Sequence, residues 1–146
     1  MTICDGKKQL SFTIADYQYP DAKRSTKKDY NYDANWLTVR VSVTQENEPL
    51  TDEDPCLMTD ELIDMRRGMN AILAGKRSCA ILETLEPYFR IAFAATAGGF
   101  VILMEYHVWE GRRHVVTWSA AEHMDRARFR EIRDEIAALC EKYPER

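Results

Sequence analysis

Polar and hydrophobic residues alternate along several short stretches of the chain, and a period of two predicts β-strands. The first two stretches are residues 9–15 and 35–45. One face of the second stretch carries Leu37, Val39, Val41 and Val43. Between residues 78 and 120 the same period predicts four more strands. One of these, 100–109, is apolar on both faces, so we expect a central strand that is covered on both sides.

Two segments have hydrophobic residues at steps of three and four, which is the spacing of an amphipathic helix. The first begins at Thr59 or Asp60, either of which can cap it. It ends near Gly75, because glycine suits the residue after a helix. The second helix is predicted over residues 125–142, and Pro144 prevents its continuation.

The order of the predicted elements is β-β-α-β-β-β-β-α. Between the second strand and the first helix lies NEPLTDEDP, residues 47–55, where two prolines and turn-forming acids predict a break in regular structure. Short turns between the later strands favour an antiparallel sheet with helices packed on it. We therefore predict one α+β domain over residues 1–146, with a mainly antiparallel sheet of about six strands and two packed helices.

The composition is that of an ordinary soluble globular protein, with 45% hydrophobic and 30% charged residues in a chain of 146. The segment MTICDGKKQLSF lacks the apolar core of a signal peptide. No apolar run approaches the about 20 residues that span a bilayer. We expect a cytoplasmic protein with no role in membranes. In that reducing compartment the four widely spaced cysteines are expected to be thiols.

The net charge of −4 arises in the middle of the chain. Residues 51–86 hold eight acidic and four basic residues, whereas the segments on either side are balanced. Direct nucleic-acid binding requires clustered basic residues, so this distribution argues against it. A carboxylate-rich surface instead suits a basic protein partner, because complementary charge accelerates association and excludes wrong partners.

Motifs for catalysis or metal binding are weak. His107 and His114 flank a predicted turn, and with a nearby acid they could serve a small metal-dependent hydrolase, but no H-x-x-x-H or H-x-H spacing supports this. The stretch LAGKRS contains a Gly-Lys pair. In a phosphate-binding loop aligned on this pair, the first glycine would stand at Asn70 and the Ser or Thr at Arg77, so the motif is absent. We therefore expect no catalytic residue, no metal site and no cofactor.

Four short motifs occur in order around the first predicted helix: YQYP, DANWLTVRVSV, DPCLMTDEL and, after the helix, EPYFRIAF. Their order and spacing, over roughly residues 9–95, resemble the WapI-like immunity proteins of bacterial polymorphic toxin systems. The likeness rests on Tyr17, Pro20, Asp33, Asn35, Trp36, Leu37, Asp54, Pro55, Leu57, Thr59, Glu61, Leu62, Glu86 and Pro87. The resemblance implies a bacterial protein without catalytic residues that binds and neutralises a partner toxin, often a nuclease.

Charge and resemblance together predict that a cognate toxin or other basic protein docks on the acidic middle of the chain. The predicted partner-binding residues are Trp36, as an aromatic anchor, and Glu46, Glu48, Asp52, Glu53, Asp54, Asp60, Glu61 and Asp64. Two alternatives stay open: a ligand-binding or oligomeric scaffold with a tryptophan-lined sheet face, and the hydrolase described above. Asp33 and Asn35 are expected to fix the start of the second strand.

Overall fold

The computed structural model describes residues 1–26, 28–45, 48–110 and 114–146, without the side chains of Gln45, Glu48, Glu110 and His114. Within these residues eight strands form two antiparallel four-stranded sheets. The first sheet contains β1 (Thr2–Asp5), β2 (Lys8–Tyr17), β3 (Trp36–Gln45) and β4 (Glu48–Met58). The second contains β5 (Cys79–Glu83), β6 (Phe89–Thr96), β7 (Gly99–Glu110) and β8 (His114–Met124). The helices are α1 (Thr59–Leu73) and α2 (Arg126–Lys142), and a 3₁₀ turn covers Asp33–Asn35.

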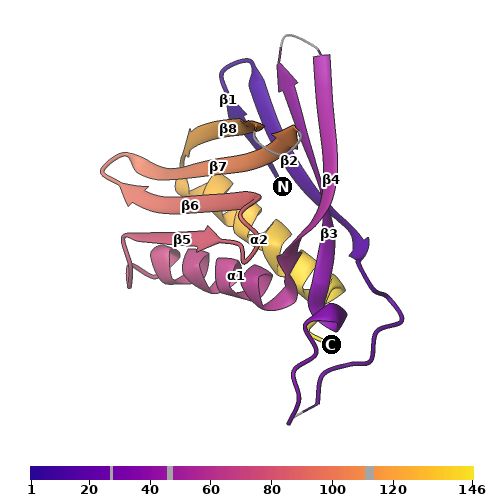
Figure 1. The fold of residues 1–146 in the computed structure, drawn as a ribbon. Coiled ribbons are helices and arrows are strands. Elements are labelled where there is room, and N and C mark those ends of the chain that lie inside the picture. Colours follow the sequence, from indigo (N-terminus) through magenta and orange to yellow (C-terminus); the bar gives the residue numbers. More distant parts are fainter. Residues whose placement is uncertain (27, 46–47, 111–113) are drawn as a thin grey trace.

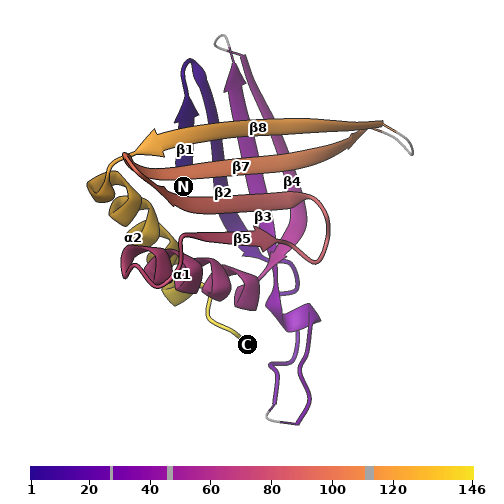
Figure 2. The same cartoon turned by 90° about the vertical axis from the view of Figure 1, so that its left-hand side faces the viewer.

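The two sheets run across one another, and the two helices pack together beside them (Figures 1 and 2). Inward-facing residues of both sheets and both helices form one continuous hydrophobic core. Phe12 of β2 meets Phe89 of β6 edge to face, and Phe129 of α2 stacks on Phe100 of β7. None of the helices in the described part of the chain is long and apolar enough to cross a membrane.

The predicted α+β class and the two helices are confirmed, but the prediction of a single sheet of about six strands is wrong. Two strands were missed. The first is β1, which is too short to show an alternating pattern. Its one fully buried residue is Ile3. The second is β4, which occupies most of the segment where the prolines predicted a break.

Two prolines fit into β4 because it is the edge strand of its sheet. The register with β3 runs unbroken from the pair Gln45–Glu48 to the pair Thr38–Pro55, and Pro49 and Pro55 are six residues apart in it, so both have the same orientation. A proline in an edge strand keeps its missing N–H on the open side, where it removes no bond from the ladder. The effect of the two prolines is to leave the open edge of β4 short of donors, which hinders pairing with a further strand.

The prediction that β7 is covered on both sides is also wrong. Its even-numbered residues from Phe100 to Tyr106 are buried in the core. The opposite face, which includes Leu103 and His107, is only partly covered, and Trp109 near the strand end is 48% exposed. An apolar residue at half-burial looks the same in sequence as one in the core, which explains the error.

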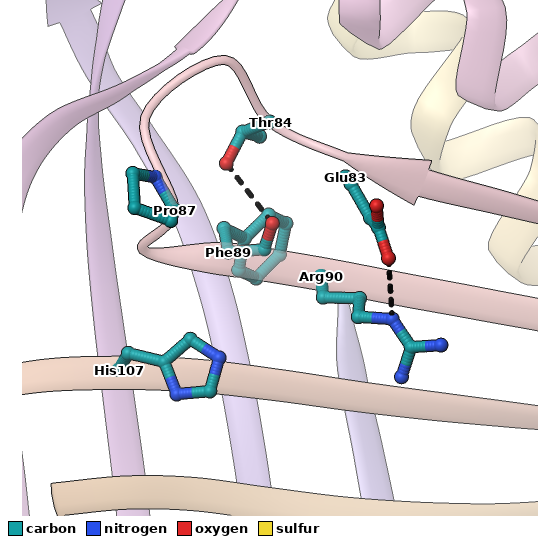
Figure 3. A pocket seen from close by; sticks show the side chains of 6 residues that line it. All are labelled: Glu83, Thr84, Pro87, Phe89, Arg90 and His107. Carbon is teal, nitrogen blue, oxygen red and sulfur yellow. Dashed lines mark hydrogen bonds and ion pairs between the residues drawn. The ribbon is translucent and has the colours of Figure 1, made fainter. Parts of the chain in front are cut away.

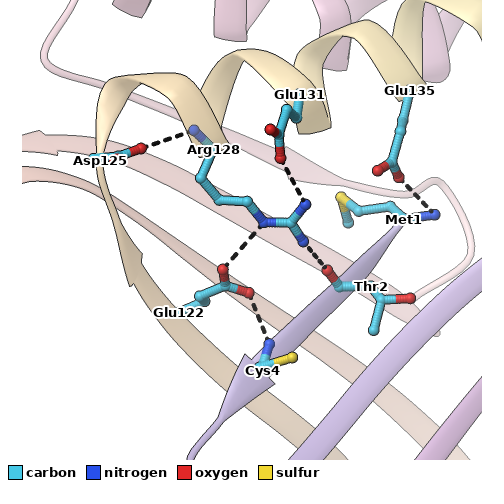
Figure 4. A network of polar contacts seen from close by, with 8 residues as sticks. All are labelled: Met1, Thr2, Cys4, Glu122, Asp125, Arg128, Glu131 and Glu135. Atoms are coloured by element: carbon cyan, nitrogen blue, oxygen red, sulfur yellow. Dashed lines mark hydrogen bonds and ion pairs between the residues drawn. The ribbon is translucent and has the colours of Figure 1, made fainter.

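The neighbouring edges of β1 and β8 are joined by side chains, not by a strand ladder (Figure 4). Glu122 of β8 accepts a hydrogen bond from the backbone N–H of Cys4 at 2.8 Å, and Asp5 of β1 accepts one from the backbone N–H of Ala121 at 3.4 Å. Arg128 of α2 pairs with Glu122 at 3.3 Å. At each of these two edges, therefore, a backbone N–H group is hydrogen-bonded to a carboxylate of the other sheet.

Asn35 is fully buried and connects four parts of the chain. Its amide nitrogen donates to Ser25 Oγ and to the carbonyl oxygens of Asn31 and Arg146. Its amide oxygen accepts from Thr59 Oγ1 at 2.9 Å and from the backbone N–H of Arg146 at 2.8 Å. Asn35 therefore fixes the start of β3, as predicted. Asp33, named in the same prediction, is exposed, and its described hydrogen bond is made by its backbone N–H to Asn31 Oδ1.

Asn35→Ala is expected to destabilise the protein by about 2–4 kcal/mol, because it leaves several buried donors and acceptors without partners. Urea unfolding would measure the change. The matched control is Asp33→Ala in the same turn, where the side chain is exposed and the expected loss is below about 0.5 kcal/mol. Equal losses for the two variants would contradict the role given to Asn35.

The predicted turn at TAGGF is confirmed, and its two glycines differ in a testable way. Gly99 has a φ of 145°, and a Cβ there would overlap the carbonyl oxygen of Met124. Nothing lies within 4 Å of a Cβ built on Gly98. Gly99→Ala is therefore expected to lower the free energy of unfolding by about 2 kcal/mol or more. Gly98→Ala should change it by less than about 0.5 kcal/mol, and a similar loss for both would be inconsistent with this geometry.

Candidate functional site

The inner face of β4 carries two carboxylates to the place where the two sheets meet. Asp52 and Asp54 pair with Val41 and Val39 of β3, whose side chains are in the core. Opposite them, β7 supplies Tyr106, which is fully buried. The Tyr106 hydroxyl lies 2.9 Å from Asp52 Oδ2 and 3.3 Å from Asp54 Oδ2. A phenol has one proton to donate, so two carboxylates compete for a single hydrogen bond.

This competition leaves Asp54 in an unfavourable position. Burial and then repulsion from Asp52 raise the pKa of Asp54, and the contact with Tyr106 offsets them only in part. Burial also raises the pKa of the Tyr106 hydroxyl, as does its bond to Asp52. On the same strand, burial and the nearby carboxylates raise the pKa of the Cys56 thiol to about 12, so this cysteine stays protonated. The cluster is a desolvated negative site.

An open cleft adjoins this cluster. Its volume is about 380 Å³, and it is lined by Gln18, Trp36, Asp54, Pro55, Glu86 and Tyr88. Trp36 begins β3, and Glu86 and Tyr88 come from the loop between β5 and β6. The register of β4 against β3 shifts beside Pro55. A bulge redirects side chains locally, which lets an inward carboxylate and the outward Trp36 share one cleft.

The structure brings together only some of the predicted partner-binding residues. Trp36, Asp52 and Asp54 gather at the cleft and the adjoining cluster. Glu53 lies on the opposite face of β4 and pairs with Arg40 at 2.7 Å. Glu46 lies outside the described residues. Glu48 belongs to β4, with its side chain outside the described part.

The predicted acids of α1 have separate positions. Glu61 accepts hydrogen bonds from the backbone N–H groups of Met58 at 2.8 Å and Leu85 at 2.6 Å, so it holds the helix start against the β5–β6 loop. Its burial raises the pKa of its carboxyl group despite these bonds. Asp60 and Asp64 are exposed, and Asp64 pairs with Arg67 at 3.0 Å. The acids therefore do not form one continuous patch.

The cleft carries negative charge for which the described residues provide no counterion. No described lysine or arginine lies within ion-pairing distance of Asp52, Asp54 or Glu86. Several carboxylates elsewhere on the same sheets are paired: Arg90, for example, contacts both Glu83 and Glu105. The cleft differs from these positions in lacking a described cation.

Sequence reasoning missed Tyr106, Tyr88 and Gln18 as parts of this site and did not group Glu86 with the acids of β4. Glu86 is about thirty residues further along the chain, and only the crossing of the two sheets brings it there. The one available signal was the resemblance, which already included Glu86 beside Trp36, Asp54 and Pro55.

A smaller cavity of about 230 Å³ contains His107 together with Glu83, Thr84, Pro87, Phe89 and Arg90 (Figure 3). The Glu83 carboxylate is engaged by Arg90 at 3.1 Å. Thr84 Oγ1 donates to the carbonyl oxygen of Phe89 at 2.9 Å. The described hydrogen bond of the His107 ring is to the Thr117 hydroxyl, at 2.9 Å, and no described carboxylate is hydrogen-bonded to the ring as the orienting group of a catalytic triad.

The structure does not support a two-histidine metal site. His114 pairs with Glu110, three ladder positions beyond the pair of His107 with Thr117, which is about 10 Å along the strands. The His114 side chain lies outside the described part. Among the described residues, no three His, Cys, Asp or Glu side chains are arranged to hold a metal ion.

Asp54→Asn is expected to stabilise the protein at about pH 7. Because folding raises the pKa of Asp54, its charged form destabilises the folded state at pH values above that raised pKa. The destabilisation disappears as the pH falls through the raised pKa of Asp54 in the folded state toward the pKa of an aspartate in the unfolded chain, which is about 4. The gain in urea unfolding free energy should therefore shrink at about pH 4.

The matched control on the same strand is Glu53→Gln, which removes an exposed carboxylate and its pair with Arg40. It should give no stabilisation at either pH. An Asp54→Asn protein that is less stable than the parent at pH 7 would show that the cluster is not strained as described.

No curated protein matches the chain closely enough to count as a relative. A family model, described as the immunity protein WapI-like family, matches residues 1–144. The match includes the last third of the chain, beyond the motifs that carry the sequence resemblance. The chain therefore belongs to the WapI-like immunity protein family.

Proposed function

We propose that this protein is the immunity partner of a toxin, which it neutralises by direct binding and without catalysing a reaction. The observation that carries the proposal is the family match over residues 1–144. The His107 cavity is compatible with it, because the Glu83 carboxylate there is paired with Arg90 and the Thr84 hydroxyl is bonded to the carbonyl oxygen of Phe89. The binding surface proposed is the acidic part of β4 and its surroundings.

The open edges of the described sheets favour recognition through side chains over addition of a strand. Prolines occupy positions 49 and 55 on the free edge of β4. Helix α1 lies along β5, with Gly68 so near that a Cβ there would be 2.9 Å from Ala80 Cβ. The edges of β1 and β8 cap one another. A partner therefore gains little from backbone pairing and must read shape and charge.

One observation favours a second candidate function, the oligomeric scaffold. The outer face of the second sheet is not covered by another described element, and Ile81, Trp109 and Val115 on it are 57%, 48% and 40% exposed. Exposed apolar residues on one face are typical of contact surfaces. Sedimentation equilibrium would test this, since a monomer at high concentration excludes self-association through that face.

The test of the proposed function uses the toxin domain encoded next to this chain in its source genome. Producing the toxin alone is expected to stop growth, and producing both proteins should restore it. Titration calorimetry with the purified pair should give a one-to-one complex whose affinity falls as salt is raised, because the contact surface is charged.

The control is a toxin domain from a different gene pair, which this chain should neither bind nor neutralise. Absence of a complex with the neighbouring toxin, together with unrestored growth, would refute the proposed function.

A further inference from the structure

We infer that the cleft between Trp36, Asp54, Glu86 and Tyr88 receives a cationic side chain, arginine or lysine, from the bound protein partner. The inference deepens the proposed function and rests on it for the identity of the partner. It replaces a diffuse acidic surface by one concave site that holds one type of group. The acids on the opposite face of β4 and on α1 are not part of it.

Charge is the first argument. Asp54 and Glu86 line the cleft, Asp52 lies beside Asp54 at the Tyr106 hydroxyl, and no described cation is paired with any of them. None of the described hydrogen bonds uses Asp54 Oδ1 or the Glu86 carboxylate. A cation that enters the cleft therefore finds acceptors that are not already engaged. Charge-assisted bonds of this kind are about twice as strong as neutral ones.

The walls of the cleft are the second argument. Trp36 and Tyr88 are both partly buried aromatic residues, and Pro55 adds an apolar surface between them. Aromatic faces attract arginine and lysine through their ring quadrupoles and accommodate the aliphatic stem. A volume of about 380 Å³ is at the small end for ligand sites, which suits one long side chain.

The strain at Asp54 is the third argument. The carboxylate shares a single phenol proton with Asp52 across 2.9 and 3.3 Å, an arrangement that an asparagine at position 54 would relieve. A carboxylate that is held beside a second carboxylate and also faces an open cleft is typical of a binding position, because stability and function compete there. A cation in the cleft would remove the repulsion between the two acids.

The geometry also explains why this position is separate from the rest of the acidic segment. Glu53 follows Asp52 directly in sequence but lies on the other face of β4, where Arg40 neutralises it. Glu61 is occupied by two backbone N–H groups. Asp64 is held by Arg67. These three acids already have partners, whereas Asp54 and Glu86 in the cleft have no described cation beside them.

The first experiment needs no knowledge of the partner. ¹⁵N-labelled protein is titrated with N-acetyl-arginine amide and, separately, with N-acetyl-citrulline amide, which has the same shape without the charge. The arginine compound is expected to shift the Trp36 indole and the Tyr88 amide resonances, and the citrulline compound should leave them unchanged. Equal shifts with both compounds, or none with arginine, would overturn the inference.

The second arm uses Glu86→Gln, with Glu53→Gln as the matched control. Both residues are exposed, so both variants are expected to fold. Glu86→Gln should weaken the binding of the arginine compound about threefold or more, and Glu53→Gln should leave it at the parent value. Equal weakening by the two variants would mean that general charge, not the cleft, attracts the cation.

The same two variants separate this inference from the proposed function. If the neighbouring toxin binds the parent and Glu86→Gln equally well, the cleft inference fails while the immunity function stands. If no toxin binds but the arginine compound still shifts Trp36, the immunity proposal fails and the cleft remains a cation-binding site. Loss of toxin affinity in Glu86→Gln alone supports both.

Discussion

The hydroxyl group of Tyr106 must find a polar partner, because its side chain is fully buried where the two sheets meet. A hydroxyl left alone in an apolar core costs about 1–3 kcal/mol, so this requirement constrains the opposite strand. The partners are Asp52 and Asp54, on the inner face of β4, where hydrophobic residues would otherwise be expected. One buried phenol thus draws two partly buried carboxylates together beside the adjoining cleft.

The treatment of strand edges connects the fold to recognition. In the described sheets, proline, a helix or a facing carboxylate limits pairing at each edge, which protects the protein from aggregation. The same features direct a partner to the side chains. An acidic cleft with aromatic walls and no counterion among the described residues then offers both attraction at a distance and an anchoring position.

Much of the fold could be predicted from the sequence because strong periodicity has a single structural meaning. The alternation in residues 35–45 and the helical spacing after Thr59 identified β3 and α1. The segment 48–58 could not be assigned in this way, because prolines and acids indicate a turn unless the strand is known to be an edge. Position in a sheet is a property of the whole fold and is not visible locally.

The candidate site was predictable only in part, for a related reason. Acidic composition selected the segment that carries Asp54 but gave Glu53 and Asp54 the same role, although neighbouring residues of a strand face opposite sides. Glu86 and Tyr88 come from a different sheet, and sequence distance conceals their contribution. Asn35, by contrast, was correctly assigned a structural role at the start of β3, and five hydrogen bonds account for it.

The most direct test of this account is the structure of the protein bound to its partner, with one distance measured in it. That distance joins the nearest lysine or arginine nitrogen of the partner to the carboxylate oxygens of Asp54 and Glu86. The account predicts a value within about 4 Å for at least one of the two, with the side chain against Trp36. A complex in which the cleft is left empty, or is filled by a neutral or acidic side chain, would contradict it.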